Sequence, residues 1–341
     1  MMPSLPTRQL GRTALQVPIL GLGGAPLGDL FERIPEERAL ATVERAYELG
    51  VRLYDTAPLY GYGLSEHRMG HVLRRKPRDS YVLSTKVGRL LFAEDPARID
   101  RGIFRGGLNF RPEYDYSYDG TLRVVEQSLQ RLGVERIDVS LIHDVDIWTH
   151  GSRESYEARL DEAIKGAYRA LDRLRGEGVV KAVGVGVNEV EACVRFAESC
   201  RIDCFLLAGR YTLLEQGGLD DLLPLAERQG SSFLLGGPFN SGILATGPVP
   251  GAKYNYQDAP PEIMGRVRRI EAVCRRHGVP LAAAAIRFPL GHGQVASIVP
   301  GAVRPEEVEH NAALIATPIP ADLWAELKAE NLLRPDAPTP V

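Results

Sequence analysis

The most informative segment of this 341-residue chain reads Tyr54-Asp55-Thr56-Ala57-Pro58-Leu59-Tyr60-Gly61-Tyr62-Gly63-Leu64-Ser65-Glu66. Its order of residues is typical of the end of a β-strand, a tight turn rich in Pro and Gly, and the start of a helix. A turn of this kind places an acid, Asp55, and a phenol, Tyr60, at the mouth of a parallel sheet. Any other strand of that sheet that ends in a reactive side chain would bring that side chain to the same edge, beside Asp55 and Tyr60.

Two further segments end in this way. Tyr81-Val82-Leu83-Ser84-Thr85-Lys86 is a predicted strand that ends in a lysine, and Ile137-Asp138-Val139-Ser140-Leu141-Ile142-His143 is one that ends in a histidine. An acid, a phenol, an amine and an imidazole at the carboxyl ends of separate strands form a set suited to proton transfer. The sequence therefore predicts a catalytic group of four residues: Asp55, Tyr60, Lys86 and His143.

Short apolar runs recur along the whole chain, each bounded by Gly, Pro or charged residues. The eight runs are Val17–Leu22, Val51–Asp55, Tyr81–Lys86, Ile137–His143, Ala182–Val187, Asp203–Ala208, Ser232–Leu235 and Val295–Val299. Several lack alternation, which is typical of parallel strands buried on both faces. The helical patterns between them are Pro35–Leu49, Ser65 to about Arg75, Thr121–Leu132, Leu160–Arg175, Glu189–Ser199, Leu219–Arg228, Pro261–Arg276 and Arg304–Leu314.

Eight alternating strands and helices favour a closed α/β barrel over an open sheet. We expect a single-domain (β/α)8 TIM barrel over residues 8–331, followed by a loosely ordered Pro-rich tail, residues 332–341. Two connections, Gly88–Gly120 and Gly247–Ala259, are longer than ordinary loops. Loops of that length at the carboxyl face of a barrel usually serve as lids or binding loops.

The bulk composition narrows the class of protein. A net charge of −3 and a pI near 6.2 give no reason to expect nucleic acid or an anionic membrane as a partner. No apolar run resembles a signal peptide or a membrane span, so we expect a cytoplasmic protein. The four cysteines match no zinc-site spacing and are expected to be inert buried thiols, with a redox-sensing cysteine as the alternative; they are Cys193, Cys200, Cys204 and Cys274.

The chemistry of the predicted set depends on the pair Tyr60 and Lys86. A free phenol has a pKa of about 10 and is a poor base at neutral pH. An ammonium about 4 Å away, at an effective dielectric constant of about 20, would stabilise the phenolate by about 4 kcal/mol and lower the pKa by about three. Asp55 would neutralise and position the lysine, and His143 could donate a hydrogen bond to a carbonyl or hydroxyl oxygen.

Each residue alone also has a simpler interpretation. Asp55 could only cap a turn, and Lys86 could be a solvated strand end. His143, with Asp144 and Asp146 nearby, is compatible with a metal site or with a structural histidine. The set of four is favoured because three separate strands each deliver a member to the same end.

The glycine-rich segments do not form the GxGxxG fingerprint of a Rossmann domain. Gly21-Leu22-Gly23-Gly24 and Gly184-Val185-Gly186 are more typical of tight turns at strand ends. Val299-Pro300-Gly301-Ala302 follows the last strand and leads into a helix, so its backbone amides could hold a phosphate.

These residues resemble the aldo-keto reductases from about Arg8 to Ala313. The Tyr54–Glu66 block is close to the family signature, and the other matching segments occur in the family's order: Ser84-Thr85-Lys86, Leu141-Ile142-His143, Gly186-Val187-Asn188 and Pro300-Gly301-Ala302 to Asn311. The resemblance implies a (β/α)8 barrel that binds an extended nicotinamide dinucleotide without a Rossmann domain. It also implies that Tyr60 exchanges the proton, that Lys86 and Asp55 tune it, and that His143 orients the substrate oxygen.

Within the family the chain is most similar to the bacterial branch containing D-threo-aldose 1-dehydrogenase (L-fucose dehydrogenase) and pyridoxal 4-dehydrogenase. The segments that carry this are Thr85-Lys86-Val87-Gly88-Arg89, the Tyr114–Gly120 loop, Ser128-Leu129-Gln130-Arg131-Leu132-Gly133 and Ile142-His143-Asp144. The branch implies oxidation of an aldose such as L-fucose, L-galactose or D-arabinose at C1 to the lactone. The alternatives are pyridoxal oxidation, general aldehyde or ketone reduction, a redox-inactive barrel that senses cofactor for a protein partner, and a metal-dependent isomerase or lyase using His143, Asp144 and Asp146.

The same resemblance assigns the ligand contacts. The implied cofactor-binding residues are Gly24, Asn188, Gly237, Phe239, Ser241, Gly301, Ala302, Val303, Arg304, Glu307 and Asn311, and Trp148 is a suspected substrate contact. Ala208 replaces a glutamine of many relatives, and Gly236 replaces the aromatic residue that stacks on the nicotinamide, for which Phe239 and Tyr211 are the candidate substitutes. Gly301 and Glu307 stand where a basic residue often binds the 2′-phosphate, so we expect NAD to be preferred over NADP. A small sugar or aldehyde is the expected partner, no metal is expected, and the oligomeric state is not predicted.

Overall fold

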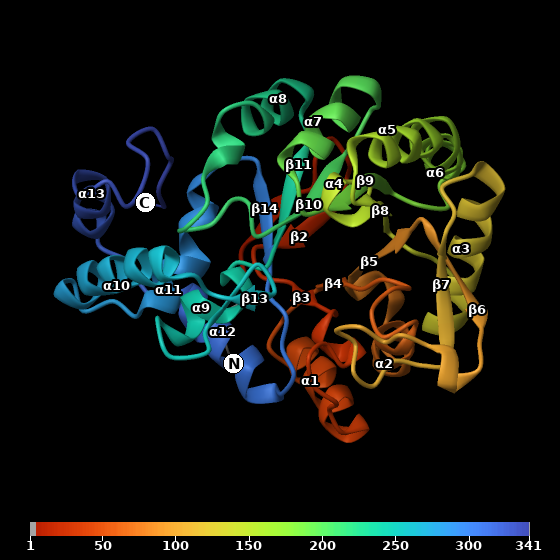
Figure 1. The fold of residues 1–341 in the computed structure, drawn as a ribbon, viewed down its shortest axis with the longest axis horizontal. Helices are drawn as coiled ribbons and strands as arrows, with labels where there is room; N and C mark the ends of the chain where they lie inside the picture. Colours follow the sequence, from red (N-terminus) through yellow and green to blue (C-terminus); the bar gives the residue numbers. More distant parts are fainter. Residues whose placement is uncertain (1–4, 341) are drawn as a thin grey trace.

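A computed structural model describes residues 5–340, which form a barrel of eight parallel strands surrounded by helices (Figure 1). Around the barrel the order is β3, β4, β5, β8, β9, β10, β11 and β14. Their bounds are β3 (Leu22–Gly23), β4 (Leu53–Asp55), β5 (Val82–Val87), β8 (Val139–His143), β9 (Ala182–Val187), β10 (Cys204–Ala208), β11 (Ser232–Gly236) and β14 (Val295–Val299). Parallel bridges from Leu20 to Ile298 and from Gly23 to Gly301 close the ring between the first and last strands. The predicted (β/α)8 architecture is confirmed.

Helices cover the outside of the barrel (Figure 1). They are α1 (Glu36–Glu48), α2 (Leu64–Leu73), α3 (Tyr118–Leu132), α4 (Ile147–His150), α5 (Arg153–Glu162), α6 (Arg169–Gly176), α7 (Val190–Ser199), α8 (Leu222–Gln229), α9 (Ile243–Thr246), α10 (Pro261–Arg276), α11 (Leu281–Arg287), α12 (Pro305–Ala316) and α13 (Ala321–Ala329), with a π-helical turn, Ala163–Tyr168, between α5 and α6. The limits of α3 have local causes. The Ser117 side chain accepts a hydrogen bond from the Gly120 amide at its start, and Gly133 ends it in the left-handed conformation.

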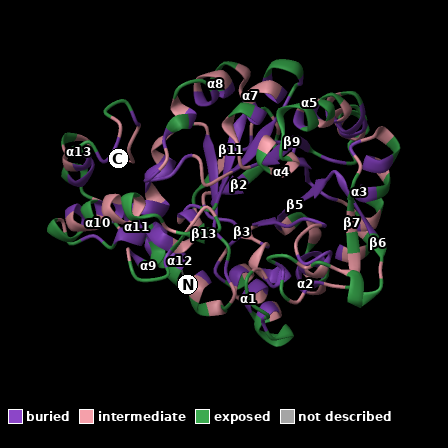
Figure 2. Ribbon diagram, in the orientation of Figure 1, coloured by how far each residue is buried: buried purple, intermediate pink, exposed green. Residues whose placement is uncertain are grey.

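The core has two parts, and the strands separate them, which is why the strands are buried throughout (Figure 2). A small cluster fills the inside of the barrel and includes Leu53, Leu141 and Leu234. A larger cluster packs the outer faces of the strands against the helices. Burial on both faces removes the polar-apolar alternation of a half-exposed strand, so the apolar runs predicted the strands well.

The first predicted strand, Val17–Leu22, is divided in two, and this part of the prediction is wrong. Its first half belongs to an antiparallel hairpin of β1 (Thr7–Gln9) and β2 (Gln16–Pro18), and only Leu22 and Gly23 form β3. Leu10 and Val17 of this hairpin belong to the cluster inside the barrel. The hairpin therefore plugs the end of the barrel opposite to the predicted catalytic residues.

The two long connections are ordered hairpins. Gly88–Gly120 contains β6 (Arg89–Ala93) paired antiparallel with β7 (Phe110–Tyr114), and Gly247–Ala259 contains β12 (Lys253–Tyr254) paired with β13 (Gln257–Asp258). The carboxyl-terminal tail also packs against the barrel, because Leu332, Leu333 and Ala337 are buried. The expectation of a loosely ordered tail was therefore wrong.

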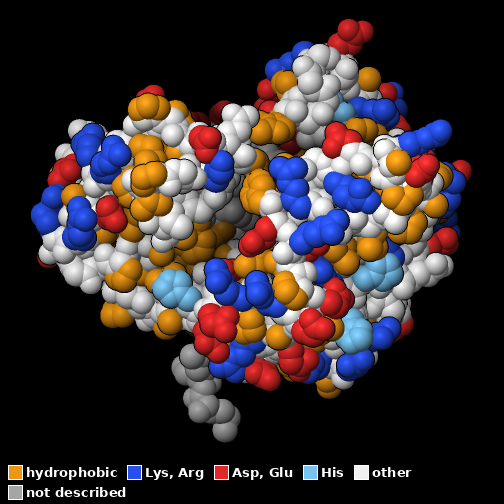
Figure 3. Space-filling view, turned by 60° about the horizontal axis from the view of Figure 1, so that its bottom comes forward, with side chains coloured by type: hydrophobic (Ala, Val, Ile, Leu, Met, Phe, Trp, Pro, Cys, Tyr) orange, Lys and Arg blue, Asp and Glu red, His pale blue; other side chains and the backbone are white. Residues whose placement is uncertain are grey.

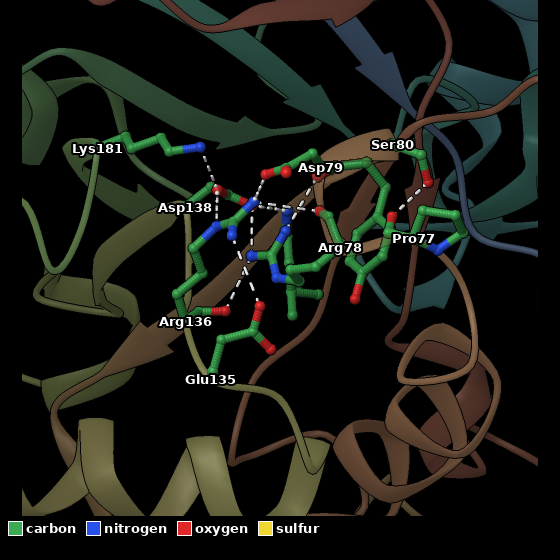
Figure 4. Close-up of polar contacts among 10 residues, drawn as sticks. Pro77, Arg78, Asp79, Ser80, Glu135, Arg136, Asp138 and Lys181 are labelled. Carbon is green, nitrogen blue, oxygen red and sulfur yellow. Dashed lines mark hydrogen bonds and ion pairs between the residues drawn. The ribbon is translucent and has the colours of Figure 1, made fainter.

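At the amino ends of β5, β8 and β9 lies a cluster of charged residues around the buried carboxylate of Asp138 (Figure 4). Arg78 donates to Asp138 Oδ2 at 2.6 Å, the Leu83 amide donates to the same oxygen at 2.9 Å, and Lys181 Nζ lies 3.1 Å from Oδ1. Arg136 lies 3.6 Å from Oδ1. The cluster ties together the chain entering three neighbouring strands.

Acidic and basic side chains are intermingled on the face drawn in Figure 3, which is hollowed near its centre and has hydrophobic side chains along the hollow. The four cysteines, Cys193, Cys200, Cys204 and Cys274, are buried and unpaired, as predicted. Burial raises the pKa of Cys200 to about 12 and that of Cys274 to about 11. Within residues 5–340, none of the helices has the length and apolar character needed to cross a bilayer.

Candidate active site

A buried ion pair joins the ends of two neighbouring strands. Asp55 ends β4 and Lys86 lies near the end of β5, and Lys86 Nζ donates to Asp55 Oδ2 at 2.7 Å and to the Thr56 carbonyl at 2.8 Å. Ser84 donates to the other carboxylate oxygen at 2.8 Å. The side chains of Lys86 and Asp55 are 0% and 4% exposed, so this pair is shielded from water. Because two N–H donors of Lys86 are held by these hydrogen bonds, its ammonium has a fixed position at the mouth of the barrel.

Tyr60 and His143 lie directly beside this pair. Lys86 Nζ is 4.5 Å from the centre of the Tyr60 ring, and the rings of Tyr60 and His143 meet edge to face with centroids 5.8 Å apart. Phe104, from the β6–β7 connection, packs 6.1 Å from Tyr60 on another side. The structure thus brings all four predicted catalytic side chains together at the carboxyl ends of the strands.

The predicted fall in the pKa of Tyr60 is wrong for this structure. Burial, and then the nearby carboxylates of Asp55 and Asp144, raise its pKa well above the ordinary value. The favourable effect expected from Lys86 is largely cancelled because its ammonium is already paired with Asp55. Tyr60 is therefore a protonated phenol at neutral pH, which suits it to donate a proton to a carbonyl oxygen.

His143 is a neutral imidazole. Burial, followed by the positive charges of Arg89 and Lys86, holds its pKa well below the ordinary value of 6.5. Arg89 lies 3.3 Å from Nδ1 and Asp144 lies 3.4 Å from Nε2. A neutral imidazole can still donate one hydrogen bond to an oxygen in the site.

A cavity of about 700 Å³ opens beside these residues, and Asp55 and Tyr60 form part of its wall. This volume is within the range of small-molecule sites, about 300–1,000 Å³. Eight of the residues assigned to the cofactor line it: Gly24, Asn188, Gly237, Phe239, Ser241, Gly301, Val303 and Glu307. The other three lie outside the lining: Ala302 and Asn311 are buried, and the Arg304 side chain is 57% exposed.

The loop after β11 bends sharply along the cavity. Asn240 and Ser241 both have positive φ angles, 48° and 63°, which are uncommon for residues other than glycine. Gly237 and Gly242 on either side also have positive φ. Such strained backbone often accompanies ligand-binding loops, where it lets the main chain approach the ligand closely.

The Gly247–Ala259 connection, predicted from its length to be a lid or binding loop, covers the cavity. Asn255 and Tyr256 form the tip of the β12–β13 hairpin, both with positive φ, as a type I′ turn requires. The Tyr256 amide donates to Ser241 Oγ at 2.9 Å, and Arg210 donates to Asn255 Oδ1 at 2.8 Å. The Tyr256 ring lies 6.4 Å from that of Phe31 on the opposite wall. The hairpin therefore bridges the cavity, as expected for a lid.

Three other predicted contacts can now be placed. Tyr211 is 1% exposed and packs against Phe288, so it does not reach the cavity and cannot stack on a nicotinamide. Phe239 and Gly236 both line the cavity, which leaves Phe239 as the predicted substitute. Trp148, on α4, is 49% exposed, is absent from the cavity lining, and donates its backbone amide to Glu189.

The carboxylate of Glu307 is fixed at the edge of the cavity. It accepts hydrogen bonds from the Val303 amide at 2.9 Å and from Arg304 Nε at 2.8 Å. The Arg304 guanidinium, just before α12, is therefore paired with a carboxylate in the first turn of that helix. The amide of Val303, one of the residues assigned to the cofactor, is likewise occupied.

The donor set fits a dinucleotide better than a metal ion. A side chain at Gly24 would lie 2.6 Å from Ser65 Oγ, and one at Gly301 would lie 2.5 Å from the Pro26 ring, so glycines hold the walls of the cavity close together. Asn188, Asn240 and Arg210 add polar groups to the lining. Over the part of the chain that the structure describes, no group of three acidic, His or Cys side chains is arranged to hold a metal ion.

Comparisons with known proteins agree with this geometry. The sequence model of the Aldo/keto reductase family matches residues 19–331. The chain is 43% identical to pyridoxal 4-dehydrogenase of Microbacterium luteolum, over 96% of this chain and 97% of that protein, and 41% identical to D-threo-aldose 1-dehydrogenase of a Pseudomonas species, over 96% of both. The holo form of an aldo-keto reductase from Bacillus halodurans superposes with a TM-score of 0.74 at 26% identity and covers 97% of both chains.

Proposed function

The chain belongs to the aldo/keto reductase family of NAD(P)-dependent oxidoreductases, and we propose that it oxidises the C1 carbon of an aldose to the lactone. The observation that carries this proposal is the meeting of Tyr60, Lys86, Asp55 and His143 at one edge of a cavity with room for a small ligand. The substrates proposed are sugars such as L-fucose, L-galactose or D-arabinose. The relative named D-threo-aldose 1-dehydrogenase supports this class.

In the proposed reaction, the bound nicotinamide dinucleotide would accept the hydride from C1. Tyr60 exchanges the proton of the anomeric hydroxyl, and His143 donates a hydrogen bond to the same oxygen. Because the pKa of Tyr60 is raised in the absence of ligands, its phenol is a proton donor as it stands. Acting as a base in the oxidation direction requires positive charge to enter the site together with the cofactor, which the oxidised nicotinamide ring would supply.

Substitution of Tyr60 by Phe tests this mechanism directly. General acid–base catalysis contributes about 10²- to 10⁴-fold, so we expect kcat to fall by that factor while the Kd for the cofactor is retained. Production of NADH from a panel of aldoses, followed by absorbance, gives the rate, and quenching of protein fluorescence gives the affinity. Turnover by Tyr60→Phe at the wild-type rate would be inconsistent with the proposal.

We propose that NAD is the preferred cofactor. Glu307 lines the cavity and holds Arg304 in an ion pair, so a 2′-phosphate at this place would meet a carboxylate before a free guanidinium. A ribose 2′-hydroxyl could instead donate to it. We expect kcat/KM to be higher with NAD than with NADP. Glu307→Gln should lower the ratio of the two kcat/KM values. A preference above tenfold for NADP in the wild type would overturn the proposal of NAD as the preferred cofactor.

Pyridoxal oxidation by the same residues is a second candidate. It is favoured by the 43% identity to a pyridoxal 4-dehydrogenase, which extends over 96% of this chain. The substrate panel therefore includes pyridoxal. A kcat/KM for pyridoxal that exceeds those for all the aldoses would assign this function instead.

A further inference from the structure

Arg89 is a buried cation beside the site to which no role has been given. It begins β6 directly after Gly88, whose φ of +108° lets the chain turn back toward the mouth of the barrel. A side chain at Gly88 would lie 2.3 Å from the Tyr116 ring, so only glycine fits there. The Arg89 side chain is 6% exposed and lies over the Tyr114 ring, with its guanidinium carbon 4.7 Å from the ring centre. Its orientation is therefore fixed by the fold.

The guanidinium of Arg89 takes part in a closed cycle of contacts with two other residues. One nitrogen, Nη1, lies 3.3 Å from His143 Nδ1, and the other, Nη2, lies 2.8 Å from Asp144 Oδ2. The second oxygen of Asp144, Oδ1, lies 3.4 Å from His143 Nε2. The imidazole is thus flanked by a group that can only donate and by a group that, when ionised, can only accept.

Both neighbours select the same tautomer of a neutral imidazole. An arginine cannot accept a hydrogen bond, so Nδ1 must present its lone pair to Arg89, and the single ring proton is then on Nε2. The carboxylate near Nε2 favours the same arrangement. The 3.4 Å separation from Asp144 is longer than a good hydrogen bond, so this N–H is not committed to the carboxylate.

We infer that Arg89, held in place by Asp144, fixes His143 as the Nε2–H tautomer and thereby keeps an N–H donor ready for the substrate oxygen. Arg89 is a positioning residue, because it acts through the imidazole. In the other tautomer, Nε2 would present a lone pair to an oxygen that also carries lone pairs, and the interaction would become repulsive. The effect of the Nε2–H tautomer on the reaction rate rests on the proposed function, whereas the tautomer itself does not.

The tautomer can be measured without substrate. In the full chain labelled with ¹⁵N-histidine, the two ring nitrogens of a neutral histidine have well-separated chemical shifts, and the spectrum of His143→Gln identifies the His143 signals. We expect a pure Nε2–H pattern in the wild type and a mixed pattern in Arg89→Met/Asp144→Asn, which lacks both selecting groups; Arg89→Met, which keeps the carboxylate, should lie between the two. Asp144→Asn should keep the wild-type pattern, since Arg89 remains; asparagine is the suitable replacement because Asp144 has a φ of +52°.

Arg159→Met is the matched control, since Arg159 also lies over the Tyr114 ring, at 5.9 Å, and pairs with Glu162 instead of His143. It should leave the spectrum unchanged. The double variant Arg89→Met/Asp144→Asn has no unpaired buried carboxylate and guards against misfolding of the single variant. A pure Nε2–H pattern in the folded double variant would overturn the inference.

Kinetics provide the second measurement. Loss of partners that orient metal-bound histidines typically costs about 10- to 100-fold, and we expect a similar fall in kcat for Arg89→Met with the KM for NAD unchanged. Arg89→Lys, which keeps a donor for Nδ1, should recover part of this loss. Equal kcat values for Arg89→Met and Arg159→Met would contradict the role in catalysis. If no tested substrate is turned over by the wild type, the proposed function fails while the spectra still decide the tautomer.

Discussion

Two buried carboxylates at opposite ends of the same barrel show how similar ion pairs come to serve different ends. Asp55 ends β4 at the carboxyl edge of the sheet, and Asp138 precedes β8 at the amino edge; they are 3% and 1% exposed. Each accepts a short hydrogen bond from a cation, 2.7 Å from Lys86 and 2.6 Å from Arg78. The bond itself does not distinguish them.

Their surroundings do. Asp138 is surrounded by three cations, from Arg78, Arg136 and Lys181 (Figure 4), and the pair lies outside the lining of the cavity, although Arg78 also lies over a tyrosine ring, that of Tyr81, at 4.7 Å. Asp55 has a single cation, Lys86, which lies against the face of Tyr60, and Asp55 itself borders the cavity. The cavity is therefore what distinguishes the two pairs. An ion pair and a phenol that border an open cavity can act on a ligand, which agrees with the general placement of chemistry at the carboxyl face of barrels.

The largest expected effect is that of Lys86→Met. Removing one partner of a buried pair leaves an uncompensated charge, which typically costs about 3–5 kcal/mol of stability. We also expect kcat to fall by about 10²- to 10⁴-fold, since the cation that contacts Tyr60 is lost. Urea unfolding and initial rates of NADH production provide the two measurements.

The double variant Asp55→Asn/Lys86→Met separates the two effects. A neutral pair of similar volume relieves the unpaired charge, so most of the lost stability should return while activity should not. Recovery of activity together with stability would show that the Asp55–Lys86 pair is only structural, and the contrast with Asp138 would disappear.

Asp138→Asn is the corresponding change at the amino end. Asparagine keeps an acceptor for the Leu83 amide but leaves the buried Arg78 without its counter-charge, so we expect a loss of roughly 2–4 kcal/mol. At a temperature where the variant is folded, kcat and KM should equal those of the wild type. Lys181→Met is the control: Lys181 is 45% exposed, and its loss should change stability by about 1 kcal/mol or less. A reduced kcat in folded Asp138→Asn would mean that the amino end also contributes to catalysis.

The two ends also differ in how well they could be predicted. The catalytic set was identified because a strand end fixes where a side chain lies, and the apolar runs marked the strand ends that deliver Asp55, Lys86 and His143 to one rim. Helices with an apolar stripe, such as α3, were found for the same reason. Helix α11 was missed because all its residues except Arg287 are buried, so it has no polar face to create a periodic pattern.

Electrostatic properties were harder to predict, because they depend on contacts between distant segments. The pKa of Tyr60 was predicted to fall, yet Asp55 neutralises the lysine and Asp144 adds a negative charge from the segment after β8. The length of Gly247–Ala259 predicted a lid, but the hairpin within it left no pattern, because its strands have only two residues each and a tyrosine with positive φ is unusual. Arg89 did leave a trace in the sequence, a glycine and an arginine directly after a strand, but only its contact with His143 suggests a role.

The smallest effect in this comparison is the pH dependence contributed by His143, which is buried at the carboxyl end. Its pKa in the folded protein is well below 6.5, whereas the unfolded chain binds a proton at about that value. Between these two pKa values the unfolded state holds more protons, so the free energy of unfolding falls as pH is lowered through this window, by at most about 1.4 kcal/mol per pH unit from this group. Stability contributed by the neutral imidazole is therefore present above about pH 6.5 and lost in acid.

His143→Gln should reduce that slope, because glutamine does not titrate. Urea unfolding from pH 8 to pH 5 would measure it, with His310→Gln, a change at an exposed histidine, as the control expected to keep the wild-type slope. Asp138→Asn should show a lower stability with the same slope, since it leaves His143 unchanged. If His143→Gln instead keeps the full dependence of the free energy of unfolding on pH, the His143 imidazole is charged in the folded protein. The surroundings of Asp55 would then resemble the cationic surroundings of Asp138 more than the structure indicates.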